Sequence, residues 1–319
     1  MAIIGTDILK AKEILTAGGL VAIPTETVYG LAANAFDASA ASKIFEAKNR
    51  PSFDPLIAHT DTLEKIRTFT NGIPERAQLL AERFWPGPLT LLLERNERIP
   101  DLVNSGLEHV AVRIPNHPLT LELLGELDFP LAAPSANPFG YVSPTCAKHV
   151  NDQLGEKIPY ILDGGHSNVG IESTIIGFEN GEPMVYRLGG LSVEAVEEVI
   201  GAVKVRPHSS SNPKAPGMLK SHYSPDKKVT LDSLDSVLAK GVAPERVGVL
   251  TFGTLTDCPI PERNRFVLSE NGDMAEAATR LFSGLRYMDS LDLDVVVAEL
   301  LPEEGLGRAI NDRLRRSAA

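Results

Sequence analysis

The chain has 319 residues, 43% of them hydrophobic and 23% charged, which is the composition of a soluble globular protein and excludes disordered, collagen-like and coiled-coil classes. No apolar run approaches the ~20 residues of a membrane-spanning helix, the first residues do not resemble a signal peptide, and two cysteines cannot build a disulfide framework, so we expect a cytoplasmic protein without a membrane segment. The net charge of −11 argues against tight non-specific binding of nucleic acid, and the length indicates two domains.

The first part of the chain alternates between helical and strand patterns. Thr6 is placed to cap a helix through Leu15, and further helices are predicted over 40–48 and 74–84. Short apolar runs predict strands over residues 20–23, 56–58, 89–93, 110–114, 131–133, 160–162, 173–178 and 184–187. Because the last three follow one another without a helix between them, we expect a mixed α/β sheet rather than a purely parallel one.

A segment rich in proline and serine divides the chain. Residues 207–217 hold three prolines, three serines and one glycine, which is typical of a linker. After it, strand and helix patterns alternate over residues 247–252, 274–287, 295–300 and 306–314. This order suggests a small parallel Rossmann-like sheet. The predicted division is therefore a first domain over 1–206, a linker over 207–226 and a small α/β domain over 227–319.

Common motifs of nucleotide-binding and hydrolytic proteins are missing from the sequence. It contains neither the P-loop pattern GxxxxGK[ST] nor the dinucleotide pattern GxGxxG. Residues 165–170 have one residue too many for a nucleophile elbow, and no two histidines have the HxxxH spacing of a zinc site. The sequence therefore gives little support to a serine hydrolase or a zinc enzyme.

Two cations at the end of a predicted helix could converge on one anion. Lys48 and Arg50 flank a single residue there. Arginine can hold a phosphate with two hydrogen bonds, and lysine adds a point charge. A solvated helix C-terminus would also favour cations, so both interpretations stand for these residues alone.

Three further polar clusters follow predicted strands, where α/β proteins place their sites. They are residues 24–30, the group of Ser135, Asn137 and Ser143, and the group of Arg113, Ser173 and Arg187. Hydroxyl and amide groups can bind phosphate or ribose without adding charge, and a buried arginine can bind an anion. A strand-to-helix turn, a capped turn and structural ion pairs would explain the same residues equally well.

Taken together, these motifs resemble the threonylcarbamoyl-AMP synthases of bacteria and archaea, in the long form with a YrdC-like domain and a C-terminal extension. The resemblance covers nearly the whole chain. It is carried by residues 24–30, Lys48 and Arg50 with 55–59, 85–90, 112–115, Ser135 and Asn137, 163–165, 172–175, Arg187 with Gly189 and Gly190, and 216–225. The chain departs from the family pattern at Asp54, where asparagine is expected and where a carboxylate would alter a nucleotide contact.

The resemblance implies a YrdC-like mixed, twisted sheet with helices and a small Rossmann-like C-terminal domain. It also implies a nucleotidyltransferase that converts L-threonine, bicarbonate and ATP, with Mg²⁺, into threonylcarbamoyl-AMP, pyrophosphate and water. The product would pass to the threonylcarbamoyl transferase machinery, which modifies tRNA next to the anticodon.

The resemblance also assigns the site residues. Lys48 and Arg50 would be the catalytic cations, and Mg²⁺ would be bridged mainly by the phosphates of ATP. The threonine pocket would consist of Thr27, His59, Arg113, Ala133 and Ser173. The nucleotide side would consist of Arg50, Asp54, Ser135, Asn137, Ser143, Arg187 and Tyr223, with Tyr223 and the linker forming a lid.

Two other classes of function remain open at this stage. One is an RNA-binding module with a weak tRNA contact, which the net charge of −11 disfavours. The other is a scaffold subunit of the tRNA-modifying assembly whose own site is inactive. The presence of Lys48, Arg50, Ser135 and Asn137 argues against an inactive site.

Overall fold

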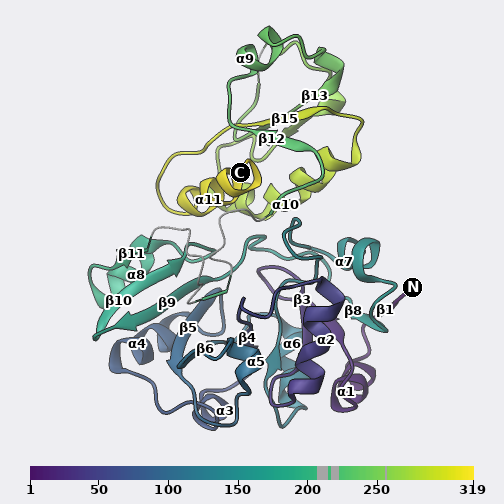
Figure 1. Ribbon diagram of the computed structural model, residues 1–319. Helices are drawn as coiled ribbons and strands as arrows, with labels where there is room; N and C mark the ends of the chain where they lie inside the picture. The colour runs from purple at the N-terminus through teal and green to yellow at the C-terminus, as the bar shows by residue number, and fades with distance from the viewer. Residues whose placement is uncertain (207–214, 217–222, 256) are drawn as a thin grey trace.

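The computed structural model describes residues 1–206, 215–216, 223–255 and 257–319. Most of the predicted linker therefore lies outside the described residues. In the described part, the strands form an eleven-stranded mixed sheet and a four-stranded parallel sheet, and Figure 1 shows the smaller sheet stacked at one end of the larger. No helix in the described part is long and apolar enough to cross a membrane.

The larger sheet is built from the first part of the chain, in the order β1-β8-β2-β3-β7-β4-β6-β5-β9-β10-β11. Its strands are β1 Ile3–Gly5, β2 Val21–Ile23, β3 Gly30–Asn34, β4 Ile57–His59, β5 Leu89–Glu94, β6 His109–Arg113, β7 Leu131–Ala132, β8 Tyr160–Leu162, β9 Thr174–Glu179, β10 Glu182–Arg187 and β11 Lys204–Val205. The helices are α1 Ile8–Thr16, α2 Ala38–Lys48, α3 Leu63–Arg67, α4 Glu75–Phe84, α5 Asp101–Asn104, α6 Pro118–Gly125, α7 Ala147–Leu154 and α8 Val193–Ile200. Parallel and antiparallel neighbours alternate irregularly, which confirms the predicted mixed sheet.

Two local expectations in this part are wrong. Helix α1 is capped by Asp7, whose side chain accepts a hydrogen bond from the amide of Lys10, rather than by Thr6. The residues after β2 lead into a second strand, β3, not into a helix. The Thr25 hydroxyl accepts from the amide of Val28 and donates to its carbonyl, which closes a tight turn and lets β3 return antiparallel to β2.

The smaller sheet has the strand order β12-β15-β13-β14 and is wholly parallel, as the sequence suggested. Its strands are β12 Lys228–Thr230, β13 Val247–Thr251, β14 Arg265–Val267 and β15 Val295–Ala298. The α-helices of this part are α9 Leu234–Ala239, α10 Met274–Ser290 and α11 Gly307–Ser317, and two 3₁₀ turns, η1 Pro244–Arg246 and η2 Glu262–Asn264, precede strands.

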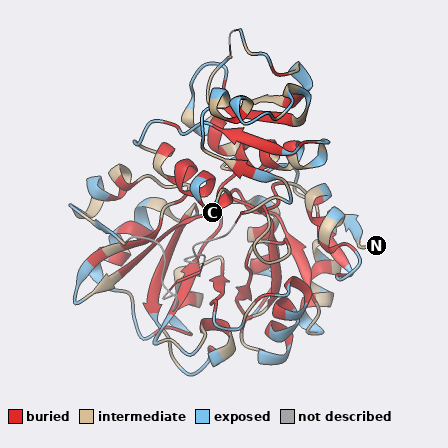
Figure 2. Cartoon of the chain, turned by 45° about the horizontal axis from the view of Figure 1, so that its top comes forward, coloured by how far each residue is buried: buried red, intermediate tan, exposed pale blue. Residues whose placement is uncertain are grey.

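One apolar core joins the two sheets. Helices α10 and α11 lie between them (Figure 1), and buried residues run through both sheets and these helices (Figure 2). Phe282 of α10 and Leu314 of α11 belong to the same buried cluster as Val28, Val142 and Ile171 of the first part. Because buried apolar surface stabilises by ~25 cal/mol per Å², this shared core fixes the two parts against each other.

Candidate active site

A cavity of about 50 Å³ opens at one edge of the larger sheet. His59, Arg113 and Arg187 are the last residues of β4, β6 and β10, and Ser173 directly precedes the antiparallel β9. The full lining is Thr25, Thr27, Val28, Gly30, Arg50, Pro55, Ile57, His59, Arg113, Ala133, Pro134, Ser135, Glu172, Ser173, Arg187, Pro216 and Tyr223. A space of this volume holds only a few water molecules.

The predicted site residues separate into two groups. Those that line the cavity are Thr27, His59, Arg113, Ala133, Ser173, Arg50, Ser135, Arg187 and Tyr223. Those that are buried behind it are Lys48, Asp54, Asn137 and Ser143. Every residue predicted for threonine is thus brought to the cavity wall, whereas part of the predicted nucleotide set supports that wall from behind.

Arg113, at the end of β6, is fixed by groups from loops of the first part of the chain. Its Nη1 donates to the Thr27 hydroxyl at 2.8 Å, its Nε donates to the Gly87 carbonyl at 3.1 Å, and its Nη2 lies 2.7 Å from a carboxylate oxygen of Glu26. The side chains of Arg113 and Glu26 are each 4% exposed. A buried guanidinium held in one orientation is suited to bind the carboxylate of a ligand.

His59 stands beside Arg113 because β4 and β6 pair in parallel with these two residues in register. Burial, and next the positive charge of Arg113, lowers the pKa of His59 to about 3. Its imidazole is therefore neutral at physiological pH and adds no charge to the cavity.

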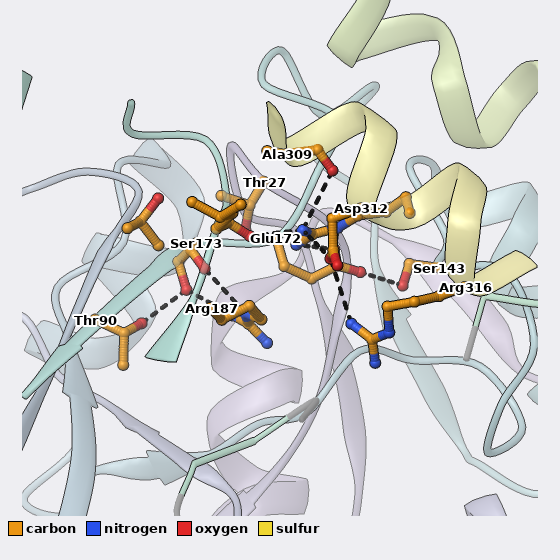
Figure 3. A network of polar contacts seen from close by, with 12 residues as sticks. Thr27, Thr90, Ser143, Glu172, Ser173, Arg187, Ala309, Asp312 and Arg316 are labelled. Atoms are coloured by element: carbon orange, nitrogen blue, oxygen red, sulfur yellow. Dashed lines mark hydrogen bonds and ion pairs between the residues drawn. The ribbon is translucent and has the colours of Figure 1, made fainter. Parts of the chain in front are cut away.

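Ser173 and Arg187 form a second fixed pair in the wall, as Figure 3 shows. Arg187 donates to both the hydroxyl and the carbonyl oxygen of Ser173 at 3.0 Å, and the Thr90 hydroxyl lies 2.7 Å from that of Ser173. Burial lowers the pKa of Arg187 to about 10, so this side chain also remains a cation at neutral pH. The cavity wall thus contains three buried guanidinium groups: Arg50, Arg113 and Arg187.

Asp54 is the counter-ion of Arg50. A carboxylate oxygen of Asp54 lies 2.9 Å from Nη2 of Arg50, and both side chains are buried. The guanidinium also donates to the carbonyls of Asp54 and Pro55. The departure from the family pattern at position 54 therefore places a negative charge against the arginine predicted to bind phosphate.

Lys48 differs from the expectation that it meets an anion together with Arg50. Its Nζ donates to the carbonyls of Ser135 and Asn137, the first at 2.5 Å, and the side chain is buried under that loop. The left-handed backbone of Asn49, with φ 52°, ends α2 between the two cations. Burial, followed by the charge of Arg50, holds the pKa of Lys48 well below its usual value. In this conformation Lys48 supports the Ser135–Asn137 loop.

Glu172 and Arg313 belong to the site, although no role was predicted for either from the sequence. Glu172 lines the cavity, accepts a hydrogen bond from Ser143 at 2.5 Å (Figure 3) and accepts two from the fully buried Arg313 of α11. Glu172 belongs to a recognised motif, and only its place next to Ser173 hinted at a role. Arg313 lies in a helix with several arginines, and nothing in its local sequence distinguishes it from Arg315 or Arg316.

Tyr223 joins the cavity to the C-terminal helices. It is buried, its ring is stacked on Phe282 at 5.5 Å, and the guanidinium of Arg316 lies 4.7 Å from the ring centre. Its carbonyl accepts a hydrogen bond from Ser317 at 2.9 Å. Tyr223 and Pro216 line the cavity, while residues 207–214 and 217–222 of the predicted lid lie outside the described residues.

Comparisons with known proteins cover both parts of the chain. The family described as "Telomere recombination" matches residues 13–189, and "Threonylcarbamoyl-AMP synthase, C-terminal domain" matches residues 191–319. The threonylcarbamoyl-AMP synthase of Pyrococcus abyssi is 41% identical over 97% of this chain and 93% of its own length. That of Bacillus subtilis is 39% identical over 98% and 93%, respectively.

The solved structures that resemble this chain agree with these matches. The crystal structure of P. abyssi Sua5 complexed with L-threonine has a TM-score of 0.90 at 39% identity, and covers 99% of this chain and 98% of that one. Escherichia coli YciO, 22% identical with a TM-score of 0.51, covers 59% of this chain and 96% of its own and shares the fold of the first part.

Proposed function

The chain belongs to the threonylcarbamoyl-AMP synthase family, and from this premise we propose that it converts L-threonine, bicarbonate and ATP into threonylcarbamoyl-AMP, pyrophosphate and water. The observation that carries the proposal is a single cavity lined by the predicted threonine residues together with Arg50 and Arg187. A threonine-binding wall and a cationic wall face the same space, as the joining of an amino acid to a nucleotide requires.

The chemistry explains why so many buried cations are needed. The amine of threonine attacks bicarbonate to give a carbamate and water, and a carbamate oxygen then attacks the α-phosphorus of ATP. The bond from that phosphorus to the bridging oxygen breaks, and pyrophosphate leaves with the electron pair. Two anions must approach each other, so fixed cations such as Arg50 and Arg187 lower the barrier by stabilising charge in the transition state. No side-chain nucleophile takes part.

We assign the substrates to the two sides of the cavity. The carboxylate of threonine binds Arg113, and Thr27, His59, Ala133 and Ser173 complete that pocket. Arg50, Ser135, Arg187 and Tyr223 contact ATP, while Lys48, Asp54, Asn137 and Ser143 act on that side from behind the wall. The distinction between residues that contact ATP and residues that act from behind is supported by the cavity lining, which contains the first group and not the second.

Mg²⁺ enters as part of the MgATP substrate. The described residues contain no group of three or more His, Cys, Asp or Glu side chains placed to hold a metal ion. The ion would neutralise phosphate charge and orient the leaving pyrophosphate. We further propose that the product passes, in the cytoplasm, to a transferase that modifies tRNA.

Release of pyrophosphate tests the reaction. It should require both threonine and bicarbonate, and mass spectrometry should detect threonylcarbamoyl-AMP. Serine should react at least about fivefold less efficiently, because the loss of one methyl contact costs ~1 kcal/mol or more. Equal release of pyrophosphate with ATP alone would identify a hydrolase instead and contradict the proposal.

A further inference from the structure

A carboxylate lies in the wall of a cavity that has to accept anions. Glu172 is 6% exposed and lines the cavity together with Ser173 and Tyr223. Left alone, its charge would repel the phosphates of a nucleotide, and at a low local dielectric that repulsion would be strong. Its two carboxylate oxygens are instead used in opposite directions: one accepts from Ser143 at 2.5 Å, the other from Arg313 at 3.0 and 3.1 Å.

Arg313 reaches this carboxylate from the other part of the chain. It lies in α11, is fully buried and does not line the cavity. Besides its bidentate contact with Glu172, it donates to Asp312 at 3.0 Å and to the Leu188 carbonyl at 2.6 Å. The guanidinium is therefore fixed on several sides. It contacts the cavity wall through the carboxylate of Glu172 and through the ring of Tyr223, whose centre lies 5.2 Å away.

The loop that contains Ser143, residues 141–143, is also held by helix α10. Arg286 donates to the carbonyls of Val142 and Ser143, and to the side chain of Gln153 at 2.9 Å. Its guanidinium also lies 5.1 Å from the ring centre of Tyr141. Residues 141–143 are thus bound directly by Arg286 of α10, and Ser143 is linked through Glu172 to Arg313 of α11.

We propose that Arg313 is a positioning residue for the nucleotide: it neutralises Glu172 and orients it so that Ser143 and the neighbouring wall are held ready for ATP. The proposal rests on the function proposed above and gives the C-terminal part of the chain a specific task at the site. Figure 3 shows the hydrogen bond between Ser143 and Glu172, with Asp312 of α11 nearby.

The ionisation of Glu172 is consistent with this role. Burial by itself would raise the pKa of Glu172, but Arg313, Arg187 and the Ser143 hydrogen bond outweigh it and hold the pKa below its usual value. The carboxylate is therefore charged at neutral pH and depends on its cation, so the removal of Arg313 would leave a buried negative charge beside the nucleotide.

The alternative is that Arg313 merely fastens the two parts of the chain together. Arg308 provides the matched control, because it lies on the same helix and pairs with Glu194 of the first part at 3.0 Å. That pair is 37% and 44% exposed and lies away from the cavity lining. Arg308→Gln therefore removes a contact between the two parts and leaves the contacts of Glu172 with Arg313 and Ser143 unchanged.

The test compares Arg313→Met, Arg313→Lys, the double variant Glu172→Gln/Arg313→Met and Arg308→Gln in the full-length protein. KM values for ATP and for threonine are measured by pyrophosphate release, the affinity for a non-hydrolysable ATP analogue by calorimetry, and folding by the thermal midpoint. We expect Arg313→Met to raise KM for ATP and weaken analogue binding at least tenfold, while KM for threonine changes less than threefold. Arg313→Lys should be intermediate, and Arg308→Gln should match the wild type.

The double variant separates positioning from fastening. Glu172→Gln removes the unpaired charge left by Arg313→Met but restores no link to α11, so it should recover at least half of the lost ATP affinity on a logarithmic scale. Recovery would support the proposal. Three results would overturn it. The double variant could bind the ATP analogue no more tightly than Arg313→Met, or Arg313→Met could raise KM for ATP and for threonine equally. The third is a folded Arg313→Met variant with wild-type KM for ATP.

Two further outcomes are distinguishable. If Arg313→Met does not fold, Arg313→Lys and the double variant carry the same comparison. If the wild type releases no pyrophosphate with threonine and bicarbonate, the proposed function fails; the analogue affinities of the wild type and the variants still decide whether Arg313 positions a nucleotide.

Discussion

The threonine side and the nucleotide side of the cavity are supported from different parts of the chain. Arg113 is held by Glu26, Thr27 and the Gly87 carbonyl, all from the part that forms the larger sheet. On the other side, Ser143 is held through Glu172 and through its own carbonyl by arginines of α10 and α11. The groups that hold Arg113 thus all come from the first part of the chain, whereas Glu172 and Ser143 also depend on how the second part docks.

Arg113→Gln should have the largest effect and should fall on the threonine side alone. The variant loses the charge that we propose binds the substrate carboxylate, and it leaves Glu26 as a buried carboxylate without its cation, a change that costs ~3–5 kcal/mol for buried pairs. We expect kcat/KM for threonine to fall at least about 100-fold, with KM for ATP changed less than threefold.

Arg98→Gln is the matched control for this variant, because Arg98 is an exposed arginine whose guanidinium lies over the Phe36 ring, 4.2 Å from its centre. Steady-state kinetics with each substrate varied in turn provides the measurement. A comparable loss of ATP affinity in Arg113→Gln would mean that the two sides of the cavity are not supported independently.

Lys48→Met should have the next largest effect, on the nucleotide side. Methionine keeps much of the volume but leaves the buried carbonyls of Ser135 and Asn137 without their donor, at a cost of ~1–3 kcal/mol for each group left unsatisfied. We expect a 10- to 100-fold fall in kcat/KM for ATP, measured by pyrophosphate release.

Lys43→Met is the control for Lys48, because Lys43 lies on the same helix and donates to the Gly18 carbonyl at 2.7 Å, but at the surface. It should leave the kinetics within twofold of the wild type. Should the folded Lys48→Met variant also keep wild-type kinetics, the support that Lys48 gives to the Ser135–Asn137 loop would not matter for the nucleotide.

The smallest effect concerns pH and the neutral state of His59. Its pKa is about 3 in the folded protein and ~6.5 in the unfolded chain, so between these values the unfolded state binds the additional proton. The contribution of neutral His59 to the free energy of unfolding is complete above pH ~6.5. It declines as the pH falls, by up to ~1.4 kcal/mol per pH unit.

Urea unfolding between pH 7.5 and 5 checks this contribution of His59. Groups common to both proteins cancel in the comparison, so His59→Gln should lose less stability than the wild type as the pH falls. Parallel stability curves for the two proteins would contradict a buried neutral histidine beside Arg113.

Local pattern was sufficient to place polar residues at the ends of two strands, while their assignment to threonine came from the family resemblance. The apolar runs 56–58 and 110–114 indicated strands, and the polar residues at their ends indicated a site. Because β4 and β6 are parallel and in register, His59 and Arg113 necessarily meet at one edge of the sheet. The return strand β3 was missed, since a turn closed by the Thr25 hydroxyl has no strong signature within residues 24–30.

The sequence by itself determined the family, the mixed sheet and the residue types at the strand ends, because burial and chain reversal leave short-range patterns. Only the tertiary structure decided that Lys48 turns to backbone carbonyls, that Asp54 faces Arg50, and that Glu172 is held from α11. Glu172 and Arg313 are 141 positions apart. Their pairing depends on how the apolar faces of α10 and α11 dock against Val28, Val142 and Ile171, and that docking is fixed by shape and burial across the whole chain rather than by any local run of residues.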